Sequence, residues 1–230
     1  MTDFVSSKLR RRTFLGGALA SSMLALPGCE SLGGFSLVDA IRRLLFVSSE
    51  RAFARLTAPD GFWDEAVGKI GLDAVLGTRA NALGGILTSA VFKNRLEDAF
   101  ADIALEGSAR AAPLVADAVR VIGIENAVAL VNGGPGAATS FLRQSMGTTL
   151  VEAMVPELGN AMRMAEEPLV AELLASLTGI DIGGAARNLA NHVDHTIWRE
   201  IAVEEAAIRA DPLATNDPVL IGVFGTAARL

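Results

Sequence analysis

The chain has 230 residues, of which 51% are apolar, 20% are charged and only 5% are aromatic. This length predicts one or two domains, and the apolar fraction is high enough for a folded core, which excludes a disordered or collagen-like chain. The formal net charge of −6 leaves no excess of Lys or Arg to neutralise phosphates, so we expect no nucleic-acid partner. A single cysteine excludes a disulfide framework and any multi-cysteine metal site.

Residues 1–28 have the pattern of an export signal. A basic start is followed by the uncharged run 13–26, TFLGGALASSMLAL. This run is shorter than the roughly 20 apolar residues that cross a hydrocarbon core, but it fits the apolar region of a signal peptide. We therefore predict that residues 1–28 are cleaved on export. The basic start ends in a motif that resembles the twin-arginine export signature, and its expected signal residues are Arg11, Arg12, Phe14 and Leu15.

The cysteine directly follows this run, in the sequence Leu26-Pro27-Gly28-Cys29. The sequence resembles a bacterial lipobox, in which the cysteine is diacylated on sulfur, becomes the new N-terminus and is acylated again. Pro27 stands where a smaller residue is usual, but Pro-Gly still provides the non-helical backbone that a peptidase needs. A lone cysteine is more often a buried free thiol, whereas the position of Cys29 after the apolar run favours lipidation.

These features predict where in the cell the mature chain is located. Acyl chains contribute about 0.8 kcal/mol per buried methylene, so several chains on Cys29 would hold the protein at a membrane, its first expected partner. Glu30 stands where lipoproteins of the inner membrane often have Asp, so we expect the outer membrane, with the protein facing the periplasm. Residues 29–35 would be the lipidated tether and residues 36–230 a helical domain.

The mature chain shows the apolar spacing of helices. A short apolar run could be a strand by composition, but no second run with alternating apolar residues is present to pair with it. We predict an all-α fold, a single multi-helix, bundle-like domain. Gly107-Ser108 is expected to end one helix and Pro113 to begin the next, while Asp217 is expected to be the N-cap of the last helix. The predicted helices cover about 36–57, 83–106, 113–122, 125–131, 137–146, 149–164, 168–179, 189–210 and 219–228, with only short helical turns over 62–77.

The sequence Asn132-Gly133-Gly134-Pro135-Gly136 invites comparison with a phosphate-binding loop. It lacks the ending of a P-loop, and the segment before it has the pattern of a helix, whereas a dinucleotide fingerprint needs a strand there. Asn-Gly after a helix is an ordinary left-handed stop. We therefore predict a structural turn.

Two further groups of residues are candidates for chemistry. His192 and His195 are the only histidines and lie on one helix face, where they could hold zinc, but the sequence shows no third ligand, and a solvated surface is the more economical interpretation. The neighbouring pairs Glu204-Glu205 and Glu166-Glu167 could act as acid and base, although adjacent acidic residues are more typical of a solvated helix face. We expect no metal and no cofactor.

The methionines gathered in one stretch are expected to fill the core, with an adaptable apolar cleft as the alternative: Met146, Met154, Met162 and Met164.

Several separated motifs resemble one exported bacterial family, the domain of unknown function 4197. They are Pro59-Asp60-Gly61-Phe62, the stretch 124–157 with its paired glycines, residues 204–212 (EEAAIRADP), and Val223-Phe224-Gly225. The resemblance covers about residues 37–225 and implies a secreted or lipid-anchored helical protein, without implying an activity. The chain departs from the family at Pro135-Gly136, where acidic residues are more usual.

Three functions remain open at this stage. The first is a non-enzymatic, lipid-anchored module that binds an envelope protein or another envelope component. The second is a carrier of small apolar or lipid ligands in a cleft between helices, suggested by the Ala- and Met-rich apolar faces. The third is an enzyme that uses carboxylates such as Glu204 or Glu205. No convergent catalytic set is visible, so we expect binding rather than catalysis.

Overall fold

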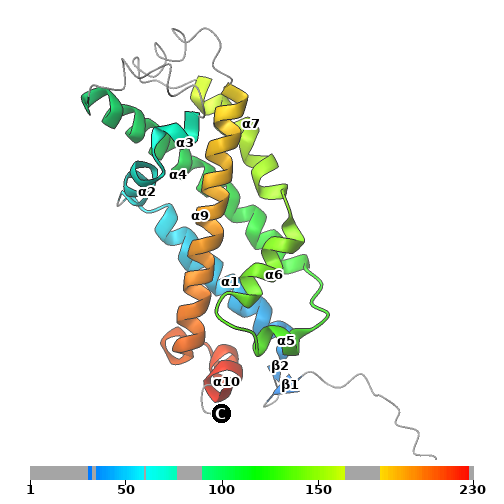
Figure 1. Ribbon diagram of the computed structural model, residues 1–230. Helices are drawn as coiled ribbons and strands as arrows, with labels where there is room; N and C mark the ends of the chain where they lie inside the picture. Colours follow the sequence, from blue (N-terminus) through cyan, green and yellow to red (C-terminus); the bar gives the residue numbers. More distant parts are fainter. Residues whose placement is uncertain (1–30, 33–34, 60, 77–89, 164–181, 228–230) are drawn as a thin grey trace, which may run out of the picture.

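A computed structural model describes residues 31–32, 35–59, 61–76, 90–163 and 182–227. The predicted all-α fold is confirmed (Figure 1). Two short strands pair in antiparallel fashion before the first helix, with Leu32 opposite Phe35. The elements are β1 (Ser31–Leu32), β2 (Phe35–Ser36), α1 (Leu37–Leu56), α2 (Phe62–Ile70), α3 (Leu72–Leu76), α4 (Ala90–Val121), α5 (Ala127–Val131), α6 (Ala137–Met146), α7 (Thr149–Arg163), α9 (Ile182–Ala210), the 3₁₀ helix η2 (Pro212–Thr215) and α10 (Pro218–Ala227).

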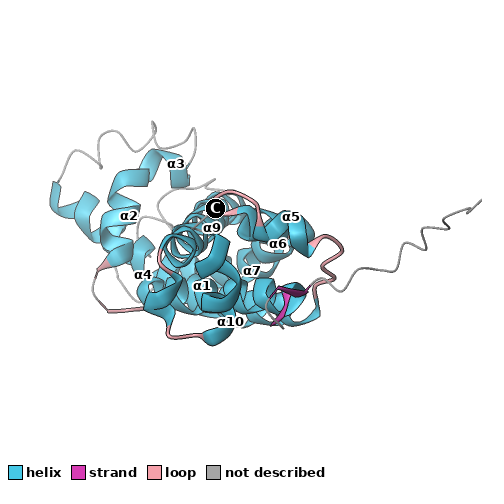
Figure 2. Cartoon of the chain, turned by 90° about the horizontal axis from the view of Figure 1, so that it is seen from below, coloured by secondary structure: helices cyan, strands magenta, loops and turns pink. Residues whose placement is uncertain are grey.

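The long helix α9 is the centre of the bundle. Helices α1 and α7 pack along it, and α4 contacts both of them (Figure 1). Helices α2 and α3 lie near one end of the bundle, and α5 and α10 lie at the other, as the end-on view of Figure 2 also shows for α10 beside α1. The core is closed by side chains with no exposed surface, each of which contributes about 1.5–3 kcal/mol by its burial: Ile41, Leu44, Leu45, Leu142, Leu150, Leu189, Ile197 and Ile201. None of the helices in the described part of the chain is both long enough and apolar enough to cross a membrane.

The predicted interruption at Gly107-Ser108 is wrong, because α4 runs through it without a break. Gly107 is buried against α7, where an added Cβ would lie 3.0 Å from Cδ2 of Leu158, so the glycine serves close helix packing and does not end the helix. The Ser108 hydroxyl is satisfied within the same helix by donating to the Ala104 carbonyl at 2.9 Å. Pro113 is accepted inside α4, but it has no N–H, so the Ala109 carbonyl loses its usual donor one turn later.

The segment 62–77 is more helical than predicted. Helices α2 and α3 are short and are each preceded by a glycine with a positive φ, Gly61 at 81° and Gly71 at 79°. Trp63 anchors α2 to the end of α1, where its indole N–H donates to the Leu56 carbonyl at 3.0 Å. Frequent changes of chain direction over this segment break the apolar periodicity, which explains why the pattern alone underestimates its helix content.

The predicted cap of the last helix is confirmed. Oδ1 of Asp217 accepts from the N–H groups of Val219 and Leu220 at 3.0 and 3.2 Å, and Oδ2 accepts from Nε of Arg43 in α1 at 2.5 Å. Burial alone would raise the pKa of the Asp217 carboxyl, but the Arg43 guanidinium and the helix N–H groups outweigh it and lower the pKa. The Asp217 carboxylate thus caps the start of α10 and connects α10 to α1. The predicted helix 168–179 lies outside the described residues.

Candidate ligand-binding groove

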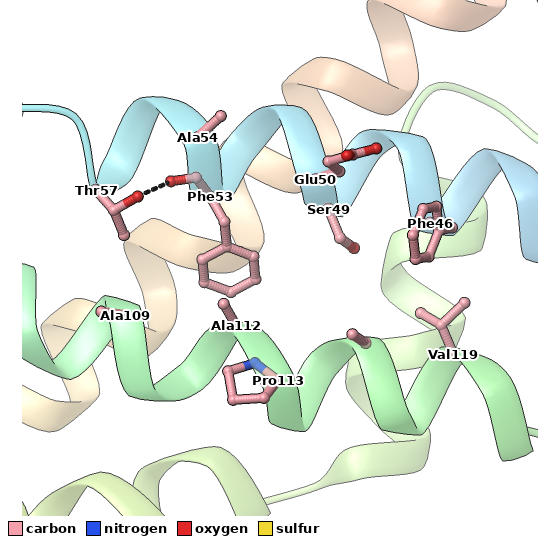
Figure 3. A pocket seen from close by; sticks show the side chains of 11 residues that line it. Phe46, Ser49, Glu50, Phe53, Ala54, Thr57, Ala109, Ala112, Pro113 and Val119 are labelled. Atoms are coloured by element: carbon pink, nitrogen blue, oxygen red, sulfur yellow. Dashed lines mark hydrogen bonds between the residues drawn. The ribbon is translucent and has the colours of Figure 1, made fainter.

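A groove of about 480 Å³ lies between α1 and α4 (Figure 3). This volume falls in the range of small-molecule sites, about 300–1,000 Å³. Most of the surface that faces the groove is apolar. Its lining residues are Phe46, Ser49, Glu50, Phe53, Ala54 and Thr57 from α1 and its C-cap, and Ala109, Ala112, Pro113, Ala116 and Val119 from α4.

The groove exists because large side chains on one wall face small ones on the other. Phe46 and Phe53 point from α1 toward α4 in Figure 3, and Phe53 lies above Ala112. Alanines spaced three and four residues apart form the facing wall, so no side chain of α4 fills the space between the two rings. Phe53 is only 7% exposed and Phe46 is partly buried, so both residues lie mostly within the bundle.

Two polar side chains of this recess have no partner among the described residues. The Ser49 side chain is 5% exposed, and its buried hydroxyl oxygen has no hydrogen-bond partner. Figure 3 shows this hydroxyl on the side of α1 that faces α4. The neighbouring Glu50 carboxylate is exposed and makes no hydrogen bond or ion pair with any residue that the structure describes.

Two further hollows contain charged side chains that are already paired. One, of about 430 Å³, lies between α2 and α9, and there Lys69 contacts Glu65 at 2.6 Å and Arg199 contacts Glu200 at 3.1 Å. The other, of about 410 Å³, lies beside the turn 132–136 and includes Arg209. The α1–α4 groove is distinguished from both by its apolar lining and by its unpaired acceptors.

Beside that turn, Glu205 forms the most buried polar cluster of the described chain. Its carboxylate has no exposed surface and accepts four hydrogen bonds, from the N–H of Ala138 at 3.0 Å, from the N–H and hydroxyl of Thr139 at 2.7 and 2.6 Å, and from Nε of Arg209 at 2.8 Å. The first three donors lie at the start of α6, where free N–H groups and the positive end of the helix dipole favour an anion. Glu205 therefore caps α6 from another helix.

Arg209 completes this cluster. Its two terminal nitrogens donate to the carbonyls of Leu130 and Val131 at the end of α5, at 2.8 and 2.9 Å, and its guanidinium lies 5.0 Å from the ring centroid of Phe224 in α10. The turn between α5 and α6 is thus fixed by a Glu–Arg pair one helical turn apart on α9, which supports the structural interpretation of this turn.

Glu204, the other acidic candidate that the structure describes, is also engaged. Glu204 and Glu200 both accept from Arg55 of α1, Glu204 at 3.1 Å, and this joins α1 to α9. Glu204 is therefore held by Arg55 of α1, and Glu205 by Arg209 of α9 itself and by the start of α6. This arrangement holds the helices together and does not present a paired acid and base. Glu166 and Glu167 lie outside the described residues.

The two histidines do not converge with carboxylates. His192 is partly buried and His195 is exposed, while Asp194 between them turns inward to accept from Arg143 at 3.0 Å and from the Trp198 indole at 2.8 Å. Across the described residues, no group of three or more His, Cys, Asp or Glu side chains is placed to hold a metal ion. Burial, and to a lesser degree the neighbouring His195, lowers the pKa of His192.

The methionines and the export residues have different outcomes. Met154 and Met162 are buried core residues, as predicted, and the groove is lined by alanines instead. A sequence signal for the groove was available in the small residues at 109, 112 and 116 around Pro113, but Ser49 and Glu50 had no signal of their own. The residues predicted for export and lipidation lie outside the described residues: Arg11, Arg12, Phe14, Leu15 and Cys29.

The chain belongs to the family described as "Protein of unknown function (DUF4197)", whose model matches residues 31–225. The match begins at β1 and ends within α10, so it includes the groove and the Glu205 cluster. No curated protein and no solved structure matches the chain.

Replacement of Glu205 by Gln is expected to destabilise the fold by about 3–5 kcal/mol, because the buried Arg209 loses its counter-ion and an amide cannot accept from all four donors. Glu204→Gln is the matched control, with an expected loss of about 1 kcal/mol, because Arg55 is partly exposed and keeps Glu200. Urea unfolding of both variants measures the difference, and equal losses would contradict the assigned role of Glu205.

The lowered pKa of His192 predicts a pH dependence with a definite sign. The unfolded chain, with an ordinary imidazole pKa of about 6.5, binds the proton more readily than the folded chain. The contribution of neutral His192 to the free energy of unfolding is therefore complete above about pH 6.5 and is lost as the pH falls below that value. NMR titration should give a lower pKa for His192 than for a model imidazole, and His195→Gln should bring it part of the way back. A His192 pKa that does not respond to this substitution would show that His195 has no influence on it.

Proposed function

We propose that this chain is an exported, lipid-anchored protein of the cell envelope that binds a small apolar ligand in the groove between α1 and α4, without catalysis. The observation on which this rests is the apolar recess of about 480 Å³, with aromatic rings on one wall and small side chains on the other. Such recesses with a few polar groups are the usual form of small-molecule sites. The ligand would replace water against Phe46 and Phe53, which is favourable at about 25 cal/mol per Å² of apolar surface buried.

The absence of catalysis is proposed from the way the acidic side chains are used. Glu205 is saturated with donors and Glu204 is paired with Arg55, so these two candidate carboxylates hold helices together. The one carboxylate at the groove, Glu50, has beside it a serine hydroxyl but no histidine or lysine among the described lining residues. A nucleophile–base pair is thus not formed there by the described side chains.

The envelope location is proposed from the sequence. Cys29 follows a signal-like run, and the helical domain begins at Leu37 after a short hairpin, so acyl chains on this cysteine would hold the groove close to a membrane. A ligand of low water solubility would be most concentrated in that place. The outer membrane, with the domain facing the periplasm, is the location that we propose.

Filling the groove should abolish ligand binding. The Ala112 side chain lies below Phe53, so Ala112→Trp is expected to occupy the space that the ligand needs (Figure 3). Ala153→Trp on the exposed face of α7 is the matched control. Native mass spectrometry of the chain purified from its own membrane should show a noncovalent mass in the wild type and in the control, but not in Ala112→Trp. Denaturation removes such a mass and leaves acyl chains on cysteine in place, so the two are distinguished. A wild type without any noncovalent ligand would contradict the proposal.

Lipidation predicts a second outcome. Cys29→Ser should remove all incorporation of a clickable fatty acid into the chain, because no other thiol is present. The variant should also keep residues 1–28, since the peptidase that recognises a lipobox acts on the diacylated cysteine. Intact mass measurement of the wild-type and variant chains checks both points. Recovery of a full-length wild-type chain from the cytosol with an unmodified Cys29 would overturn the proposed location.

A further inference from the structure

We propose that the ligand of the α1–α4 groove is an apolar molecule with a protonated amine at one end, and that Glu50 binds the amine. This inference rests on the proposed function and adds the chemical class of the ligand. It follows from the charges around the groove, from the unpaired polar groups in its wall, and from the shape of its apolar part.

The charge of the residues that line the groove favours a cation. Charged side chains of α4 next to the lining residues form neutral pairs, Glu106 with Arg110 at 2.9 Å and Asp117 with Arg120 at 2.8 Å. On α1, Arg43 lies near Phe46 but is bound to Asp217 at 2.5 Å. Glu50 is the one charged residue that lines the groove, and it has no partner among the described residues. Arg51, which follows it in α1, has no partner among the described residues either, but it does not line the groove. The lining of the groove therefore carries a single negative charge.

The unpaired polar groups also suit a donor. A buried serine hydroxyl without a partner costs about 1–3 kcal/mol, which a ligand that offers an N–H group to Ser49 would recover. Ser49 and Glu50 are adjacent on α1 and both line the groove. An ammonium group has three N–H donors and no acceptor, so it matches a wall that offers oxygen acceptors.

The remainder of the groove suits an alkyl chain. Phe46, Phe53 and the alanines of α4 offer apolar surface, and no Lys, Arg or His of the described chain lines it. A fatty acid of the same length would fit this surface equally well but would bring its carboxylate toward Glu50. Like charges placed together disfavour binding, so the head group and not the chain decides which ligand binds.

Three probes with the same chain test this inference: dodecylamine, dodecanol and dodecanoate, each below its micelle concentration. They compete against a photoreactive alkylamine for labelling of the full chain in its own membranes at neutral pH, and the labelled peptides of α1 and α4 are quantified. Dodecylamine should compete about tenfold better than dodecanol, and dodecanoate should be the weakest. Glu50→Gln should remove the tenfold preference for the amine and leave competition by dodecanol unchanged.

Asp39→Asn is the matched control, because Asp39 is an exposed acid of the same helix that pairs with Arg42 and does not line the groove. It should keep the full preference for the amine, and Glu50→Asp should restore part of it. Equal competition by all three probes, or a preference that survives Glu50→Gln, would overturn the amine inference while the proposed function stands. No labelling of α1 or α4 by the photoreactive amine, together with no competition by dodecanol, would overturn both.

Discussion

A buried ion pair on α9 fixes one end of the molecule. Glu205 caps the start of α6, Arg209 closes the end of α5 and lies against Phe224 of α10, so that one turn of α9 joins three other helices. The pair has almost no contact with water, and breaking such a pair costs far more than breaking an exposed one. The motifs that resemble the family, the paired glycines before α6 and the EEAAIR segment of α9, are the two sides of this contact. Their shared occurrence in the sequence therefore has a structural reason.

The groove depends on how its two walls are held elsewhere. Helix α1 is attached to α9 through Arg55 and to α10 through Arg43 and Asp217, whereas α4 is pressed against α7 at Gly107. Each wall is thus fixed by a partner on its far side, and the small side chains that α4 turns toward α1 do not close the gap. An apolar recess that is held open in this way needs little rearrangement to admit a ligand, which lowers the cost of binding.

Much of the helical framework could be predicted from the sequence, because apolar periodicity and turn residues are local signals. The bounds of α6 and the cap at Asp217 follow from such signals. Gly107 misled the prediction, since glycine both ends helices and allows close helix contact, and only the presence of Leu158 decides between the two. For the same reason the acidic pair 204–205 resembled a solvated face or a catalytic pair, whereas the two side chains contact different arginines on different sides of α9.

The sequence by itself determined the helical class, the family and the expectation of a lipid-anchored address, because each of these depends on residue order within a short stretch. The tertiary structure alone decided that Phe46 and Phe53 face the alanines of α4, that Ser49 is left without a partner and that Glu50 stands beside an apolar recess. The wall from α1 and the wall from α4 are more than 50 positions apart along the chain, so no local sequence pattern joins them. Their relation arises from the packing of α1 on α9 and of α4 on α7, and the candidate site is a product of that packing.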